Sequence, residues 1–379
     1  TGVQTCALPI CLDENALLDV FRFHIMKINN NYVIVEHKHM NTSGGHQNSV
    51  IVDIMDFIKV GSACPKTKVA DVIFNVENIC SCIDDAYNKD VKFLVFPELS
   101  ITSYTCADLF LTSTLINKSI EGIKLVCENS INKDMLIAVG CPLIHNNVLY
   151  NTAFIIFEGK ILGIVPKSYI PNYSEFYEKR WFTAAAMLTD ELVTLPFQEN
   201  IPFGTNLIFA AGDYKFGIEI CEDLWVAIPP SSYLSLLGAN IIGNLSASNE
   251  LVSKKDYRLS LIANQSARCM SSYIYSSAGV HESTTDLLFS GHLVISENGT
   301  ILKENNRFQR ENEVITSCID VFKLNAERLK NLSYRDSSKI VPFKPKNINF
   351  NFKNTKINNF DRYIDKHPFV PSNEHEREE

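Results

Sequence analysis

Several features that would point to a membrane or a nucleic-acid partner are missing from this sequence. It has no uninterrupted apolar run of the ~18–20 residues that a spanning helix needs. Its 43 acidic residues outnumber its 35 lysines and arginines, which gives a formal net charge of −8. Nucleic acids and anionic membranes attract clustered basic residues. We therefore expect no nucleic-acid or membrane partner, and, with no secretory signal in TGVQTCALPIC, a cytoplasmic location.

Metal-binding spacing is also missing. None of the eleven cysteines falls into the pair-plus-pair pattern of a zinc site, and Cys80-x-Cys82 is a weak signal. His37, His39 and His46 lie in a polar stretch that is more typical of disorder than of a metal cluster. The sequence therefore predicts no metal site and reduced thiols.

Alternating strand and helix patterns are present instead, in a composition that is 46% hydrophobic and 21% charged. The apolar run 91–96 and the alternating run 214–220 predict strands, and the periodicity of 69–89 and 254–270 predicts helices. Hairpins are predicted at Glu158-Gly159 and Asn298-Gly299. This mixture indicates a layered α/β domain over residues 55–325.

The two ends of the chain show no such pattern. Residues 1–54 lack periodicity, and TGVQTCALPI resembles a translated sequencing adapter, so we expect a non-native or disordered leader before a start at Met55. From about residue 326 to 379 the composition shifts towards Asn and Lys, ending in EHEREE. We interpret 326–379 as a linker.

Three reactive side chains come directly after predicted strands. Glu98 follows 91–96, Lys167 follows 160–165, and Cys221 follows 214–220. Strand ends are where α/β sheets gather ligands. Singly, Glu98 could cap a helix, Lys167 could be a surface cation, and Cys221 could pack in the core. Together they supply a base, a cation and a nucleophile.

The chemistry of such a set is amide hydrolysis. The thiolate is the reactive form of cysteine, a carboxylate can take its proton and return it to a leaving amine, and an ammonium can stabilise an oxyanion. His281 and His292 are alternative bases, but no neighbouring carboxylate motif suggests how either would be oriented.

The motifs around these residues resemble a known family. FPELSITSYTCADLF, PKSYIPNYSEFYEKRWF and GIEICEDLW are similar to the three signatures of the nitrilase superfamily, the carbon–nitrogen hydrolases. PNYSEFYEKRWF, CEDLW, NLSASNE and ESTTDLLFSG resemble, more narrowly, the glutaminase domain of glutamine-dependent NAD+ synthetases. The later KHPFVP resembles the approach to the second domain of those enzymes. The resemblance covers 55–371 and implies a four-layer α-β-β-α sandwich that assembles into homo-oligomers.

The resemblance also implies roles for individual residues. Glu98 would be the general base and acid, Lys167 would stabilise the oxyanion, and Cys221 would form a glutamyl thioester. Glu175 would be an additional carboxylate that orients the lysine and the substrate. The residues expected at the glutamine pocket are Tyr173, Ser248, Lys254, Tyr104 and Trp225.

Some of these positions have simpler interpretations. Tyr104 and Trp225 could equally be core aromatics. Ser248 could cap the helix that starts near Lys254, and Lys254 could be solvated in its first turn.

The second half of such a synthetase is not represented by a motif. Its S-G-G-x-D-S loop for ATP has no counterpart, since the S-G-G at 43–45 continues with His46-Gln47. ATP, Mg²⁺ and deamido-NAD+ are therefore expected in an absent C-terminal synthetase domain, with no cofactor in this one.

Three functions remain open on the sequence. The leading hypothesis is the glutaminase half of a glutamine-dependent NAD+ synthetase. A stand-alone amidase acting on another small amide is the first alternative. A non-catalytic assembly module is the second, although the presence of Glu98, Lys167 and Cys221 argues against it.

Overall fold

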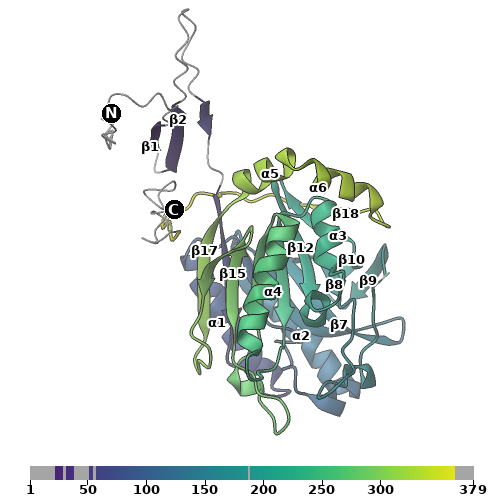
Figure 1. Ribbon diagram of the computed structural model, residues 1–379. Coiled ribbons are helices and arrows are strands. Elements are labelled where there is room, and N and C mark those ends of the chain that lie inside the picture. The colour runs from purple at the N-terminus through teal and green to yellow at the C-terminus, as the bar shows by residue number, and fades with distance from the viewer. Residues whose placement is uncertain (1–21, 29–30, 38–50, 54–56, 187, 363–379) are drawn as a thin grey trace, which may run out of the picture.

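The computed structural model describes residues 22–28, 31–37, 51–53, 57–186 and 188–362 (Figure 1). Within the expected leader, β1 (Arg22–Ile28), β2 (Asn31–His37) and β3 (Ile51–Asp53) form an antiparallel sheet. The rest of the expected leader lies outside the described residues, and its being non-native or disordered stays a prediction. Three leader histidines, His37, His39 and His46, could suggest a metal cluster. Of these, His39 and His46 lie outside the described residues.

Two larger sheets form the body of the protein. The first has eight strands, in the order β17 (Glu313–Asp320), β4 (Phe57–Cys64), β5 (Phe93–Val95), β6 (Leu136–His145), β7 (Val148–Phe157), β8 (Lys160–Pro166), β10 (Gln198–Phe203) and β9 (Glu191–Leu195). The second has seven, in the order β16 (Thr300–Glu304), β15 (Leu293–Glu297), β14 (Ser272–Ser277), β13 (Ile241–Ser246), β12 (Tyr214–Ile220), β11 (Leu207–Ala211) and β18 (Lys346–Asn349).

Helices cover the outer faces of both sheets. Residues of α1 (Val72–Asn88) and α2 (Ser113–Ser130) share one apolar cluster with the eight-stranded sheet. Residues of α3 (Pro230–Leu236) and α4 (Lys254–Cys269) share another with the seven-stranded sheet. The layers thus run α-β-β-α, and the predicted fold class is confirmed. The remaining helices are α5 (Val321–Lys330), α6 (Leu332–Ser337) and the 3-10 turns η1 (Ala107–Leu111), η2 (Glu178–Arg180), η3 (Cys221–Leu224), η4 (Val280–Glu282) and η5 (Ser338–Ile340).

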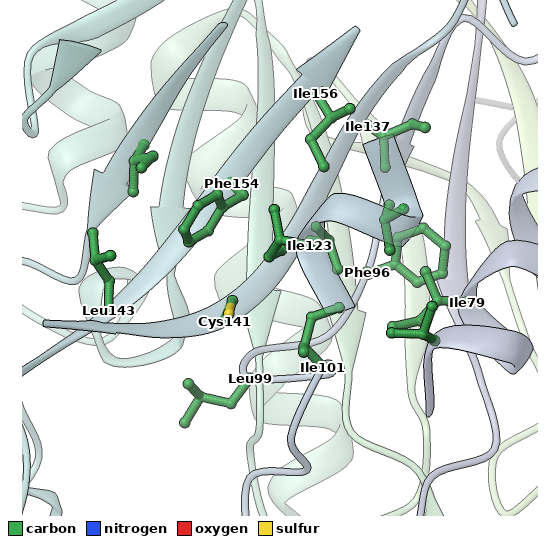
Figure 2. Packing of buried hydrophobic residues seen from close by; sticks show 14 of the residues in the cluster. Ile79, Phe96, Leu99, Ile101, Ile123, Ile137, Cys141, Leu143, Phe154 and Ile156 are labelled. Carbon is green, nitrogen blue, oxygen red and sulfur yellow. The ribbon is translucent and has the colours of Figure 1, made fainter. Parts of the chain in front are cut away.

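The strand β5 shows why a strand inside the sandwich has an unbroken run of apolar residues in its sequence. Leu94 belongs to the cluster beneath α1 and α2, while Phe93 and Val95 belong to the cluster between the two sheets. Successive side chains of a strand point to opposite faces, so a strand covered on both sides needs apolar residues at every position. Figure 2 shows the helix-side cluster, where Ile79 and Ile123 lie with Phe96, Ile137 and Phe154.

The last described residues, 344–362, form a segment that we call the C-terminal strap. Its strand β18 pairs in parallel with β11, and Phe350 belongs to the core between the sheets. Further along, the backbone N–H groups of Lys353 and Asn354 donate to Asp134 at 2.9 and 3.0 Å. Arg362 then makes a bidentate contact with Glu297. Over these residues the chain is packed against both sheets, which differs from the predicted linker.

Replacing Phe350 by alanine tests this packing. The Phe350 ring is 4.9 Å from the ring of Phe157 and 5.1 Å from that of Phe352, and the side chain is buried. Removing a buried phenylalanine costs about 3–5 kcal/mol of unfolding free energy. We expect a loss of about that size in urea unfolding. Leu329→Ala, at a side chain that is 79% exposed, should change stability by less than about 0.5 kcal/mol.

Candidate active site

The three strand-end residues converge on one edge of the sandwich. Glu98 follows β5 and Lys167 follows β8 in the eight-stranded sheet, whereas Cys221 follows β12 in the seven-stranded sheet. The Glu98 N–H donates to the carbonyl of Ser246 at the end of β13, 3.3 Å away, so the two sheets meet here. Lys167 Nζ lies 2.6 Å from Glu98 Oε1, and both side chains are fully buried.

Cys221 lies at a sharp change of direction from strand to 3-10 turn. Its φ is +46°, a left-handed conformation that is costly for a residue with a Cβ and that is common at functional sites. Asp223 holds this turn by accepting hydrogen bonds from the N–H of Ile220 at 2.9 Å and of Tyr169 at 2.9 Å. Because Tyr169 follows Lys167 by two residues, the same carboxylate ties the cysteine turn to the lysine loop.

The thiol of Cys221 is protonated at rest. Burial and the charge of Glu98 raise its pKa, against the opposing effect of Lys167 and a hydrogen bond with Ser246. A base must therefore remove the proton before the sulfur can attack.

Lys167 remains a cation in spite of its burial. Burial by itself would lower its pKa, but the carboxylates of Glu178 and Glu98 outweigh that effect and raise it well above the ordinary value.

Glu98 has one oxygen engaged and one free. Its Oε1 accepts from Lys167 and from Asn151 Nδ2, the latter at 2.6 Å. Its Oε2 is buried and has no hydrogen-bond partner among the described residues. An unpartnered buried carboxylate oxygen costs free energy unless it is needed elsewhere. Oε2 is thus the atom available to accept a proton.

Gly140 allows the Glu98 turn to lie where it does. A Cβ added at Gly140 would be 2.2 Å from the backbone N of Leu99 and 2.7 Å from the carbonyl O of Pro97, so the backbone would have to move. Displacement of a catalytic group by ~1 Å can cost about a hundredfold in rate. We expect Gly140→Ala to lower kcat at least about tenfold. Gly212→Ala is the control: its φ of +62° will cost stability, but its Cβ meets nothing within 4 Å, and kcat should be unchanged.

The second carboxylate on the lysine is Glu178, not Glu175. Glu178 places both oxygens 2.8 Å from Lys167 Nζ, and its Oε1 also accepts from the hydroxyl of Tyr104 at 2.8 Å. Glu175 accepts instead from Asn249 Nδ2. The prediction that Glu175 orients the lysine is therefore wrong.

The reason lies in one short turn. The 3-10 turn η2 starts at Glu178 and directs it inwards, where it is 2% exposed, whereas Glu175 lies in the preceding loop. A signal was present, because Glu178 is the single acidic residue in the aromatic stretch FYEKRWF. A carboxylate among residues that pack inwards is a candidate buried partner.

A cavity of about 440 Å³ opens onto Cys221. Of the residues predicted to bind substrate, Tyr173, Ser248, Lys254 and Trp225 line it, and so does Glu175. Tyr104 does not line it and reaches the site only through Glu178. The full lining is Pro171, Tyr173, Ser174, Glu175, Phe176, Cys221, Glu222, Trp225, Ser248, Leu251, Val252, Ser253, Lys254 and Tyr257.

The simpler interpretations of two pocket residues do not hold. Ser253, not Ser248, precedes α4, and no side chain caps that helix. Lys254 is half-buried and its ammonium lies 5.2 Å from the ring centre of Trp225, so it faces the cavity wall. Tyr173, on the opposite side of the loop, donates to Glu222 at 3.0 Å.

The alternative histidines are engaged elsewhere. His292 lies between Arg258 and Glu304, and burial together with Arg258 lowers its pKa to about 4. His281 contacts the carbonyl of Arg310. No group of three or more metal-ligating side chains occurs among the described residues. In the same part of the chain, no helix is long and apolar enough to cross a membrane.

Comparison with curated proteins finds relatives that are named glutamine-dependent NAD(+) synthetase. The chain is 34% identical over 285 residues to the glutamine-dependent NAD(+) synthetase of Mycobacterium tuberculosis H37Rv, which covers 74% of this chain and 42% of that protein. It is 32% identical over 327 residues to the Mycobacterium leprae protein of the same name, covering 83% and 47%. The chain thus spans less than half the length of these relatives.

Solved structures share the architecture. A glutamine-dependent NAD(+) synthetase from Cytophaga hutchinsonii superposes with a TM-score of 0.63 at 28% identity, covering 70% of this chain and 43% of that one. An amidase of the nitrilase superfamily from Nesterenkonia matches with a TM-score of 0.55 at 13% identity, covering 72% and 96%, which is a similarity of fold.

The family model for carbon-nitrogen hydrolases matches residues 59–326. The match includes Glu98, Lys167 and Cys221, and it includes both sheets with the exception of β18. This match covers well over half of the sequence, and the chain belongs to the carbon–nitrogen hydrolase family.

Proposed function

We propose that this chain hydrolyses the side-chain amide of glutamine, with Cys221 as the nucleophile. The observation that carries the proposal is the position of Cys221, between a buried Glu98–Lys167 pair and a cavity whose wall bears both a cation and carboxylates. The pair provides the chemistry of amide cleavage, and the charged wall suits a substrate that is itself an amino acid.

The first step forms a thioester. Glu98 takes the proton of the Cys221 thiol, and the sulfur attacks the amide carbon, whose oxygen becomes an oxyanion. The ammonium of Lys167 stabilises that charge in a site shielded from water, where a preorganised donor is worth about 3–4 kcal/mol. Glu98 then gives its proton to the amide nitrogen, the carbon–nitrogen bond breaks, and ammonia leaves.

The second step regenerates the enzyme. A water molecule gives a proton to Glu98 as its oxygen attacks the thioester carbon. The carbon–sulfur bond breaks, and the thiolate takes the proton back from Glu98. The new carboxylic acid gives its remaining proton to solvent, and glutamate leaves. Glu98 thus acts as base and acid in each half of the cycle, which requires one carboxylate oxygen that Lys167 does not occupy. Oε2, which has no hydrogen-bond partner among the described residues, meets that requirement.

The charged residues that line the cavity support glutamine over a simple amide. Lys254 offers an ammonium for an α-carboxylate, and Glu222 and Glu175 offer carboxylates for an α-amino group. Charge-assisted hydrogen bonds of this kind are roughly twice as strong as neutral ones. Tyr173 and Ser248 add hydroxyl groups to the same wall.

The released ammonia would serve the ATP-dependent amidation of deamido-NAD+ to NAD+, as the name of the relatives suggests. The residues of this chain do not fit ATP, because the sequence contains no S-G-G-x-D-S loop. We therefore assign ATP, Mg²⁺ and deamido-NAD+ to a synthetase domain that would be the partner of this one. A homo-oligomer and a cytoplasmic location belong to the same proposal.

Ammonia release from three amides tests the proposed function. The chain should hydrolyse glutamine at least tenfold more efficiently than asparagine or butyramide, because only glutamine places its amide at Cys221 while its charged groups reach Lys254. A preference for butyramide would identify a stand-alone amidase instead. Release from none of the three, with no glutamine binding to Cys221→Ala by calorimetry, would favour an assembly module.

A further inference from the structure

Asn249 connects two charged residues of the cavity without lining it. It follows β13 in the motif NLSASNE and is 2% exposed. Its Nδ2 donates to Glu175, and its Oδ1 accepts from Lys254 Nζ. Since a carboxylate can only accept and an ammonium can only donate, these two partners fix which way the amide group points.

The backbone carbonyl of Asn249 is hydrogen-bonded to a second group of charged side chains. Its carbonyl accepts from Arg258 Nη2 at 3.4 Å, and Arg258 Nη1 in turn lies 2.8 Å from Glu250 Oε1. Glu250 also accepts from Arg307 at 2.8 Å. Arg258 is completely buried, so this anchor is shielded from solvent. The buried Asn249 amide thus lies between two charged side chains, with its backbone carbonyl hydrogen-bonded to Arg258.

Lys254 depends on this amide for its position. Among the described residues, Asn249 is the one hydrogen-bond acceptor that its ammonium has. The rings of Trp225 and Phe176 lie 5.2 and 5.9 Å from the ammonium and fix it only weakly. Burial and, less strongly, the charge of Arg258 lower the pKa of Lys254, against opposing interactions with Cys221 and Glu175. Without a group between them, the lysine would be drawn to Glu175 and its charge neutralised.

We infer that Asn249 is a positioning residue that keeps Lys254 and Glu175 apart, so that both charges stay available to a substrate. The ammonium then has donors left for a carboxylate, and Glu175 has an oxygen left for an ammonium. The substrate class that such a wall recognises is a small primary amide with an amino-acid group at its other end. The inference rests on the proposed function and adds a determinant of its specificity.

The test compares Asn249→Ala with the parent chain on two substrates. These are glutamine and butyramide, which has neither the α-carboxylate nor the α-amino group. We expect KM for glutamine to rise at least about tenfold, with little change in kcat, because charge-assisted interactions are lost that do not involve the reacting bond. For butyramide, KM and kcat should change less than threefold.

Two further variants distinguish a role in positioning Lys254 from a general effect on the stability of the fold. Asn240→Ala removes an equally buried asparagine, which contacts Lys215 and Asp213, outside the cavity. It should leave KM for glutamine unchanged. Glu175→Gln in the Asn249→Ala background removes the charge that captures Lys254. This double variant should recover part of the affinity that Asn249→Ala loses for glutaramate, which is glutamine without its α-amino group and therefore does not need Glu175.

Each outcome decides a specific point. An unchanged KM for glutamine in Asn249→Ala, or an equal loss for both substrates, would overturn the positioning role. A further loss of glutaramate affinity in the double variant, in place of recovery, would overturn the proposed separation of charges. A parent chain that turns over butyramide better than glutamine would overturn the proposed function itself, whatever the variants show.

Discussion

Cys221→Ser should lower the rate of glutamine hydrolysis at least about a thousandfold. The serine hydroxyl has the shape of the thiol but is much harder to ionise, and the nearby carboxylates that already raise the pKa of Cys221 disfavour an alkoxide even more. Loss of the nucleophile from a working catalytic group costs at least this much in other hydrolases. Ammonia release at saturating glutamine, with turnover of parent and variant compared, provides the measurement.

The control for this variant is Cys80→Ser. Cys80 lies in α1, is partly exposed, and is remote in the fold from the strand ends. Its replacement should leave turnover unchanged. Thermal unfolding of both variants should stay near that of the parent, because each change conserves volume. Equal turnover in Cys221→Ser and the parent would exclude Cys221 as the nucleophile.

Glu178→Gln should lower kcat about a hundredfold, whereas Glu175→Gln should act mainly on KM. Both oxygens of Glu178 contact the Lys167 ammonium, so an amide would turn an N–H group towards a cation or leave one contact empty. The lysine would then no longer be held where the oxyanion forms. Losing one oxyanion donor costs a hundredfold to a thousandfold in other enzymes, that is about 2.7–4 kcal/mol. The steady-state kcat and KM of the two variants provide the measurement.

The free energy of unfolding should also be measured for Glu178→Gln and Glu175→Gln. Removing one partner from a buried ion pair commonly costs about 3–5 kcal/mol, so Glu178→Gln should also unfold at lower urea concentration. Tyr104→Phe offers a milder change at the same carboxylate, since it removes only the 2.8 Å hydrogen bond to Glu178. It should lower kcat less and retain the parent fold. A Glu175→Gln variant with the larger kcat loss would contradict the assignment of Glu178 to the lysine.

The sequence by itself determined the local elements and the reactive groups at their ends. The hairpins at Glu158-Gly159 and Asn298-Gly299 lie where turn chemistry predicted them, as β7–β8 and β15–β16. The apolar run 91–96 contains the central strand β5. These features depend on neighbours in sequence, through strand alternation and the φ preferences of turn residues. Glu98, Lys167 and Cys221 were recognisable because each directly follows such a strand.

Which side chains meet depends on how distant segments pack. Whether Glu175 or Glu178 reaches Lys167 depends on the direction of a single 3-10 turn, which the aromatic residues around Glu178 suggest but do not fix. The bridge by Asn249 joins segments that are 74 residues apart. β18 and the residues that follow it alternate Ile348, Phe350 and Phe352 with asparagines, and these apolar side chains pack on the core between the sheets. That alternation lies within the stretch interpreted as a linker, and the sequence does not say that it adds to β11 in parallel. Local sequence encodes neither which edge is free nor which turn faces inwards, because both depend on how the layers pack.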